Sequence, residues 1–142
     1  MKKIKLGVKD NNFEYGFRET CFGICYKNDK FYLTKKKNEV SLIGGGIEPG
    51  ETYLECLKRE FLEESGLRVT SINEFVTIDC FWITKTNFHM NSLANFYIVK
   101  IDESRSAPIE AECELITVSK DEILSLLPLP YQKKAIELFL EL

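Results

Sequence analysis

The chain has 142 residues, of which 44% are hydrophobic and 29% charged, and its formal net charge at pH 7 is −3. This length suits a single domain, residues 1–142, with a hydrophobic core of its own. The acidic balance argues against a nucleic-acid polymer as partner, and no apolar run approaches the ~18 residues of a membrane span. Because Met1–Lys5 is basic without a following apolar segment, we expect no signal peptide and a cytoplasmic protein.

Strand patterns come first along the chain. Thr20–Tyr26 and Phe31–Lys35 flank turn-forming residues at 28–29, which predicts a β-hairpin. A short strand is predicted over Glu39–Ile43, and Ile4–Val8 is a weaker candidate.

A helix is predicted next. Thr52, followed three residues later by Glu55, forms a capping-box pattern, so the helix should begin near Tyr53. Gly66 readily adopts the left-handed conformation that ends helices, which places the last helical residue near Ser65.

The second half of the chain has three predicted strands followed by two predicted helices. Ser119 and Glu122 form another capping-box pattern, which predicts a short helix to about Leu127. Pro130 suits the start of a final helix through Leu142, whose apolar stripe could serve the core or a homodimer interface. Further strands are predicted over Arg68–Asp79, Leu93–Ile101 and Cys113–Val118. A mixed sheet flanked by helices, an α/β fold, follows from this order.

Three acids crowd one strip of the predicted 53–65 helix. Glu60, Glu63 and Glu64 recur at i, i+3 and i+4, and each pair of like-charged neighbours costs roughly 0.2–0.5 kcal/mol. Arg59 can pair with Glu63 one turn on, which recovers part of that cost. A hard divalent cation such as Mg²⁺ or Mn²⁺ would remove the repulsion. The alternative is a solvated acidic helix face.

The segment from Gly45 to Leu67 resembles the Nudix box, G-x5-E-x7-R-E-U-x-E-E-x-G-U, in which U is a bulky aliphatic or aromatic residue. The resemblance implies an α/β/α sandwich with a mixed β-sheet. It also implies a Mg²⁺-dependent hydrolase, with Mn²⁺ as a substitute, that cleaves a diphosphate linkage in a nucleotide. Each specified position matches: Gly45, Glu51, Arg59, Glu60, Phe61, Glu63, Glu64, Gly66 and Leu67.

The resemblance also implies roles for individual residues. In Nudix proteins the carbonyl just before the first box glycine commonly joins the metal, which points to Gly44. Glu60 and Glu64 are then expected to bind the metal directly, with Glu63 as metal ligand or general base. The remaining two charged box residues, Arg59 and Glu51, are expected to pair and to fix the acidic strip.

Nudix enzymes often use one more glutamate, on a loop late in the chain. We favour Glu110 for this catalytic role, then Glu112, because both lie close before the predicted Cys113–Val118 strand; Glu103 and Glu114 are the other candidates. The alternative for any one of them is a solvated carboxylate. Arg18 and Lys35 are candidate substrate contacts, although residues 35–37 are also compatible with a solvated lysine run.

Several other residues favour structural roles. Five cysteines, an odd number without Cys-x-x-Cys spacing, predict buried thiols rather than a zinc site or a disulfide framework. The aromatic pairs at 81–82 and 96–97 are expected in the core, with base stacking as the alternative. His89 is expected on a surface loop, with a substrate contact as the alternative.

The substrate is predicted by elimination. Nudix enzymes of the ADP-ribose type tend to carry a proline about sixteen residues past the box, and those of the dinucleoside-polyphosphate type a tyrosine slightly further on. Residues 80–85 contain neither. We therefore expect a nucleoside triphosphate or a nucleoside diphosphate derivative as substrate, with nucleotide-pool sanitation as a role. The alternatives are an ADP-ribose or nucleotide-sugar pyrophosphatase and a non-catalytic nucleotide-binding sensor.

Overall fold

The computed structural model describes residues 1–142 apart from the side chain of Glu103, so that candidate carboxylate lies outside the described part of the chain. Along the sequence the elements are β1 (Lys2–Leu6), β2 (Gly16–Ile24), β3 (Tyr26–Lys27), β4 (Lys30–Lys36), β5 (Glu39–Gly46), α1 (Tyr53–Ser65), β6 (Leu67–Ile83), β7 (His89–Arg105), β8 (Cys113–Val118), α2 (Ile123–Leu126) and α3 (Pro130–Leu140).

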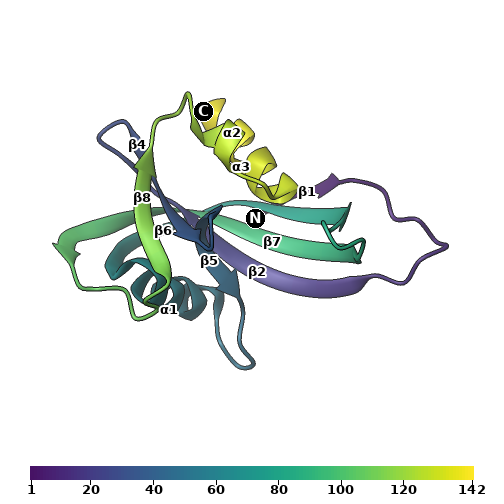
Figure 1. Ribbon diagram of the computed structural model, residues 1–142, viewed down its shortest axis with the longest axis horizontal. Coiled ribbons are helices and arrows are strands. Elements are labelled where there is room, and N and C mark those ends of the chain that lie inside the picture. Colours follow the sequence, from purple (N-terminus) through teal and green to yellow (C-terminus); the bar gives the residue numbers. More distant parts are fainter.

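The strands form one mixed sheet of eight strands. Its order is β1-β6-β7-β2-β5-β4-β3, and β8 pairs with β4. The β1–β6 and β2–β7 pairs are parallel, whereas β2–β5, β4–β5, β4–β8 and β6–β7 are antiparallel. Helix α1 covers one face of the sheet, and α2 and α3 cover the other (Figure 1). The predicted α/β fold with a mixed sheet between helices is confirmed.

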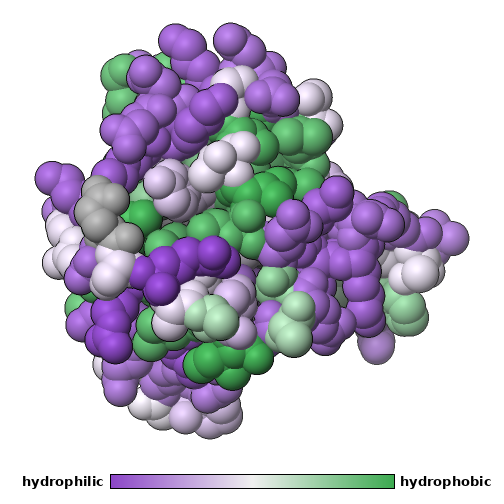
Figure 2. All heavy atoms as spheres, turned by 60° about the vertical axis from the view of Figure 1, so that its left-hand side comes forward, coloured by the Kyte–Doolittle hydropathy of each residue, from purple (hydrophilic) through white to green (hydrophobic). Residues whose placement is uncertain are grey.

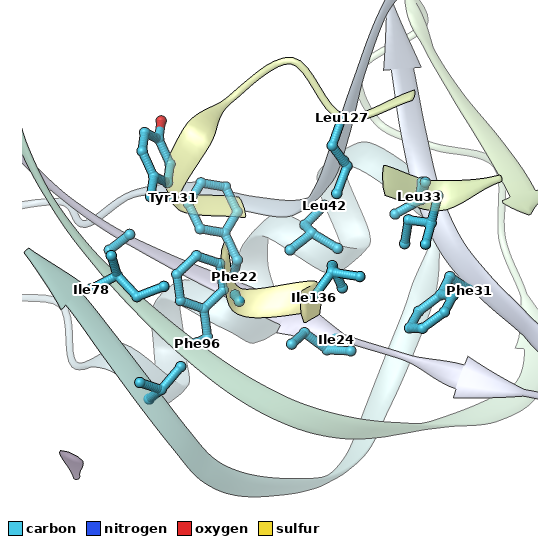
Figure 3. Close-up of a cluster of buried hydrophobic side chains, with 14 of the residues drawn as sticks. Phe22, Ile24, Phe31, Leu33, Leu42, Ile78, Phe96, Leu127, Tyr131 and Ile136 are labelled. Carbon is cyan, nitrogen blue, oxygen red and sulfur yellow. The ribbon is translucent and has the colours of Figure 1, made fainter. Parts of the chain in front are cut away.

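Each face of the sheet has its own core. The smaller core lies under α1, where Leu57 and Phe61 pack with Cys21, Ile43 and other sheet residues. The larger core packs the sheet against α2 and α3 (Figure 3). Its buried side chains include Phe22, Ile24, Phe31, Leu33, Leu42, Ile78, Phe96, Leu127, Tyr131 and Ile136.

The final helix serves the core with most of its predicted stripe. Ala135 and Ile136 are fully buried, and Phe139 packs against the same cluster. The helix ends at Leu140, two residues before the predicted end, and Leu142 is 82% exposed. The stripe therefore contributes to the larger core as far as Phe139, and Leu142 lies outside it.

Strand β2 is longer than its sequence pattern predicted. It begins at Gly16 because it pairs in parallel with β7 from Gly16–Met90 to Ile24–Ile98. Arg18 therefore lies inside a strand rather than ahead of one. His89 is the first residue of β7 and is half-buried, with its ring 3.9 Å from that of Phe13, so the expectation of a surface loop is wrong.

The second capping-box prediction holds only in part. The Glu122 carboxylate accepts a hydrogen bond from the Ser119 backbone N–H, but the Ser119 hydroxyl also donates to that carboxylate, at 2.9 Å. The hydroxyl therefore does not cap the helix, which begins only at Ile123.

The cysteine prediction is confirmed: all five thiols are free and buried. None of the helices in the described residues is long and apolar enough to span a membrane. On the face shown in Figure 2, hydrophilic side chains surround a central hydrophobic band.

Candidate active site

Helix α1 has both of the ends that its sequence predicted. The Thr52 side chain accepts from the Glu55 backbone N–H at 3.1 Å, and the Glu55 carboxylate accepts from the Thr52 N–H at 3.0 Å. Gly66 closes the helix with φ +70°, and its N–H donates to the Leu62 carbonyl. A methyl group on Gly66 would lie 1.9 Å from the Ser106 carbonyl oxygen, so only glycine fits. These caps fix which residues of the helix face the sheet.

The glycines at the end of β5 let this strand approach both β2 and α1. Gly44 has φ +155°, and a methyl group there would lie 2.1 Å from the Cys21 carbonyl oxygen. A methyl group on Gly45 would lie 2.7 Å from Oε1 of Glu60. The glycine run therefore leaves space for a carboxyl group between the strand and the helix.

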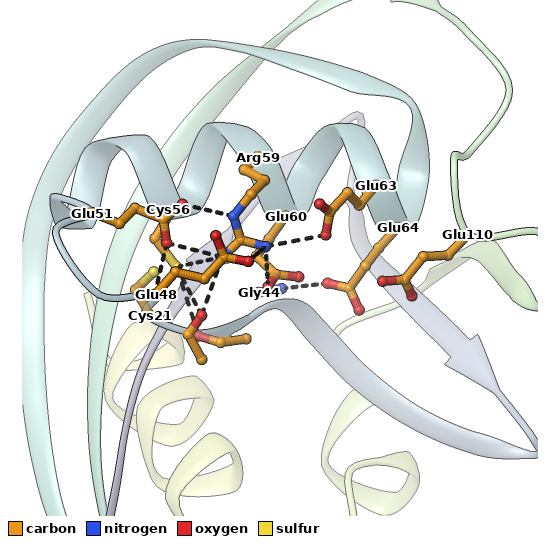
Figure 4. A network of polar contacts seen from close by, with 12 residues as sticks. Cys21, Gly44, Glu48, Glu51, Cys56, Arg59, Glu60, Glu63, Glu64 and Glu110 are labelled. Carbon is orange, nitrogen blue, oxygen red and sulfur yellow. Dashed lines mark hydrogen bonds and ion pairs between the residues drawn. The ribbon is translucent and has the colours of Figure 1, made fainter.

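Arg59 is the centre of a polar network at this point (Figure 4). Its Nε donates to Oε2 of Glu51 at 2.6 Å, and its Nη2 donates to Oε1 of the same carboxylate at 2.9 Å. Its Nη1 lies 2.9 Å from Glu60 Oε1 and 3.1 Å from Glu63 Oε2. Nη2 also donates to the Gly46 carbonyl at 3.2 Å. The expected Arg59–Glu51 and Arg59–Glu63 contacts are thus present, and one guanidinium orients three carboxylates.

The Arg59–Glu51 pair perturbs both partners strongly. Hydrogen bonding from Arg59 lowers the pKa of Glu51 to about 2. The same contact, followed by contacts with Glu60, raises the pKa of Arg59. Glu51 is therefore ionised throughout the physiological range and suits a fixed anchor rather than a proton carrier.

In contrast to Glu51, Glu60 and Glu64 have raised pKa values. Burial raises the pKa of Glu60, although Arg59 opposes this shift. Burial raises the pKa of Glu64 to about 8, and the nearby charges of Glu60 and Glu110 raise it further, while a hydrogen bond from the Gly44 N–H, at 2.9 Å, lowers it. These two crowded, poorly solvated carboxylates lie in contact with the glycine run, and Arg59 pairs with only one of them.

Glu110 is the described candidate outside the box that lies among these acids. Its backbone N–H donates to the Glu63 carbonyl at 2.8 Å, which ties it to the last turn of α1. Its charge acts on both Glu60 and Glu64. The other two described candidates, Glu112 and Glu114, have exposed side chains.

Lys36, which the sequence analysis did not single out, contacts this group. Its Nζ lies 3.4 Å from Glu110 Oε2, and its charge lowers the pKa of Glu64. Lys35 is half-buried and has the parity of the core residue Leu33, so it points to the opposite face of β4. Strand parity separates the two lysines, but it identifies the relevant one only once the face of the sheet that carries the acids is known.

Arg18 lies beside the glycine run on the neighbouring strand. A methyl group on Gly46 would be 3.2 Å from Arg18 Nη2. The guanidinium is exposed and has no hydrogen bond or ion pair with any described residue. Arg18 has the strand parity of the core residue Phe22, and its charge acts on Tyr131, so this cation lies on the α3 side of the sheet rather than among the carboxylates.

The carboxylates supply suitable oxygen donors for a hard cation, but their oxygens do not converge on one point as the ligands of a bound ion do. No three His, Cys, Asp or Glu side chains of the described residues surround a common point closely enough to hold an ion. The contacts explain this, because Glu60 and Glu63 turn toward Arg59 and Glu64 toward the Gly44 N–H. The donor chemistry, all oxygen and negatively charged, fits Mg²⁺ or Mn²⁺.

A cavity of about 520 Å³ lies on the α3 side of the molecule. Trp82 and Pro128–Pro130 form part of its wall, and Glu39 lines it from the start of β5. Glu39 of β5 is the cross-strand partner of Lys36 of β4, and Lys36 is the residue that contacts Glu110. Its size is that of a small-molecule site.

Residues 18–139 match the family profile described as NUDIX domain. Similar solved structures include the mutator protein MutT from Bacillus halodurans, 21% identical with a TM-score of 0.69 over 84% of this chain and 80% of that one. A NUDIX hydrolase from Nitrosomonas europaea is 20% identical, with a TM-score of 0.66 over 86% and 87%. A MutT NUDIX hydrolase from Burkholderia pseudomallei is 20% identical, with a TM-score of 0.65 over 86% and 97%. Because the family match spans most of the chain and the fold agrees, the chain belongs to the Nudix hydrolase family.

Proposed function

We propose that this protein hydrolyses a diphosphate linkage in a nucleoside triphosphate or a nucleoside diphosphate derivative and that it requires Mg²⁺. The observation that carries the proposal is the gathering of Glu60, Glu63, Glu64 and Glu110 against the glycine run, with Arg59 orienting two of them. A purely structural helix face would not bury carboxylates at this electrostatic cost.

The metal would be held by the carboxylates of Glu60, Glu63 and Glu64 and by the Gly44 carbonyl. When bound, Mg²⁺ would neutralise phosphate charge and lower the pKa of the attacking water. Arg59 keeps Glu60 and Glu63 on the strip that faces Gly45, and Glu51 keeps Arg59 in place. The four box residues therefore act as one preorganised unit.

Glu63 and Glu110 are the candidates for moving the proton of the attacking water. The Glu63 side chain is 28% exposed, against 12% for Glu60, so water reaches it more easily. Glu110 is 36% exposed and has one carboxylate oxygen to which no described residue donates. Both positions suit a general base, which must reach solvent as well as substrate.

The 520 Å³ cavity on the α3 side is large enough for a nucleoside base, although it lies on the opposite face of the sheet from the box carboxylates. Trp82 offers a ring for stacking and is fixed by its Nε1 hydrogen bond to Ser92 at 2.9 Å and by the ring of Tyr131. Phosphates require cations, and two are available: Arg18, which has no described partner, and Lys36, which is loosely paired with Glu110. Removing damaged nucleoside triphosphates from the nucleotide pool is the role that we favour.

We also infer that residues 1–142 act as one catalytic domain in the cytoplasm, since five free buried thiols suit a reducing compartment. Analytical ultracentrifugation tests the homodimer, which would sediment with twice the mass of the 142-residue chain.

Product-resolved hydrolysis of a nucleotide panel with Mg²⁺ or Mn²⁺ tests the proposal. The panel contains canonical and oxidised triphosphates, ADP-ribose, dinucleoside polyphosphates and a nucleotide sugar, with Glu64→Gln as the control variant. We expect metal-dependent cleavage of a triphosphate or diphosphate derivative that is lost in Glu64→Gln. Preferred cleavage of ADP-ribose would contradict the substrate assignment, and tight nucleotide binding without turnover would instead indicate a sensor.

A further inference from the structure

The thiol of Cys113 contacts the carboxylate of Glu110. Cys113 Sγ lies 3.2 Å from Glu110 Oε2, and the Cys113 backbone N–H donates to the Glu110 carbonyl at 3.1 Å. Cys113 is the first residue of β8 and is only 6% exposed. A buried side chain at the start of a paired strand is well fixed, so its thiol can hold the exposed loop carboxylate before it.

The two carboxylate oxygens of Glu110 have different contacts. Oε2 accepts from the Cys113 thiol and from the Lys36 ammonium, which is 3.4 Å away. No described residue donates to Oε1. Figure 4 shows the Glu110 carboxylate pointing toward that of Glu64. The two donors on Oε2 therefore hold the carboxylate in place, while Oε1 stays free of described donors.

We propose that Cys113 is a positioning residue for catalysis, whose thiol orients the Glu110 carboxylate toward the box carboxylates. This inference rests on the function proposed above, because it needs Glu110 to take part in the reaction. The Cys113 thiol donates a hydrogen bond to Glu110 and to no described box carboxylate, although Glu64 is close enough for its charge to act on the thiol.

Cys113 suits this task better than Lys36 does. The Lys36 side chain is 44% exposed, so solvent and salt screen its ion pair with Glu110. The thiol is a weak donor without charge, and it can hold Oε2 without neutralising the carboxylate. Orientation by Cys113 should therefore persist at high ionic strength, whereas the contribution of Lys36 should fade.

Steady-state kinetics of Cys113→Ala and Cys113→Ser, alone and combined with Glu110→Gln, test the proposal. We expect Cys113→Ala to lower kcat roughly three- to tenfold with little change in KM, which is the size of one hydrogen bond. Cys113→Ser should recover most of this loss, because its hydroxyl can donate to the same oxygen. In the Glu110→Gln background, Cys113→Ala should cost nothing further. Cys25→Ala, which removes a buried thiol elsewhere in the core, should leave kcat unchanged.

The S–H stretching band provides a readout that does not depend on turnover or on a stable alanine variant. Infrared spectra of the wild type minus Cys113→Ser isolate the Cys113 band. Glu110→Gln should shift this band to higher frequency, because a neutral amide is a weaker acceptor than a carboxylate.

Each outcome bears on a different claim. The positioning role would be overturned if Cys113→Ala lowered kcat equally in both backgrounds. It would also be overturned if the S–H band had the same frequency in Glu110→Gln as in the wild type. A fully active Glu110→Gln enzyme would also overturn it, while Glu64→Gln inactivation would leave the proposed function standing. A fully active Glu64→Gln enzyme would instead remove the proposed function itself.

Discussion

Arg59 binds both carboxylate oxygens of Glu51, through Nε at 2.6 Å and Nη2 at 2.9 Å. This paired geometry fixes the plane of the guanidinium, so its remaining Nη1 edge meets Glu60 and Glu63 in defined positions. A residue at the start of the box thus determines how carboxylates nine and twelve positions later are oriented.

Replacing Arg59 by lysine should test this arrangement. Lysine keeps the charge but cannot form the two parallel hydrogen bonds. We expect Arg59→Lys to lower kcat by about tenfold or more and the free energy of unfolding by about 1–3 kcal/mol. Kinetics and urea titration measure both, with Lys58→Arg on the exposed helix surface as the matched control. Unchanged kinetics in Arg59→Lys would show that charge alone is sufficient.

Substituting Gly45 should disturb Glu60 directly. A methyl group there would meet Glu60 Oε1 at 2.7 Å, and the end of that side chain would have to move. Gly45→Ala should therefore weaken Mn²⁺ binding at least several-fold, within the range known for groups that orient metal ligands. Electron paramagnetic resonance of free Mn²⁺ gives the affinity, and Gly50→Ala, where no atom lies within 4 Å but φ is +79°, controls for backbone strain alone. Equal Mn²⁺ affinity in both variants would contradict the steric explanation.

Glu64 should make the metal-free protein less stable at alkaline pH. Its folded-state pKa of about 8 lies above the unfolded value of about 4.3, so the folded state binds more protons between these two values. Stability from this group is therefore present at low pH and is lost as pH rises through about 8. In the presence of a chelator, Glu64→Gln should be more stable than the wild type by about 1–3 kcal/mol near pH 8.5 and nearly equal to it near pH 4.

Thermal unfolding at several pH values measures this difference. Mg²⁺ should stabilise the wild type near pH 8.5 and should affect Glu64→Gln much less. A pH profile that is the same for both proteins would show that the pKa of Glu64 is the same in the folded and unfolded states.

The three cations outside the box should differ in their effect on substrate binding. Arg18 lies beside Gly46 without a described partner, and Lys36 reaches Glu110, whereas Lys35 lies on the other face of β4. We expect Arg18→Ala and Lys36→Ala each to raise KM roughly tenfold and Lys35→Ala to change it much less, with stability within about 0.5 kcal/mol of the wild type. A larger effect of Lys35→Ala than of Lys36→Ala would restore the assignment made from sequence.

The sequence by itself determined the parts of the site that depend on local spacing. The caps at Thr52 and Gly66 fix where α1 begins and ends, and the helical period then brings Arg59 and Glu63 into contact. These interactions span a few residues, so a pattern of residue types was sufficient to predict them. The mixed sheet flanked by helices was predicted as well, because strand and helix patterns are distinct along the chain.

Only the tertiary structure decided which distant residues join that strip. Parallel pairing with β7 extended β2 past Arg18, and the same pairing placed His89 in a strand. The tether from Glu110 to the Glu63 carbonyl, and the approach of Lys36 and Cys113, depend on β8 pairing with β4. Such contacts join segments far apart in sequence, and their register is set by how the whole sheet packs, which no local pattern encodes.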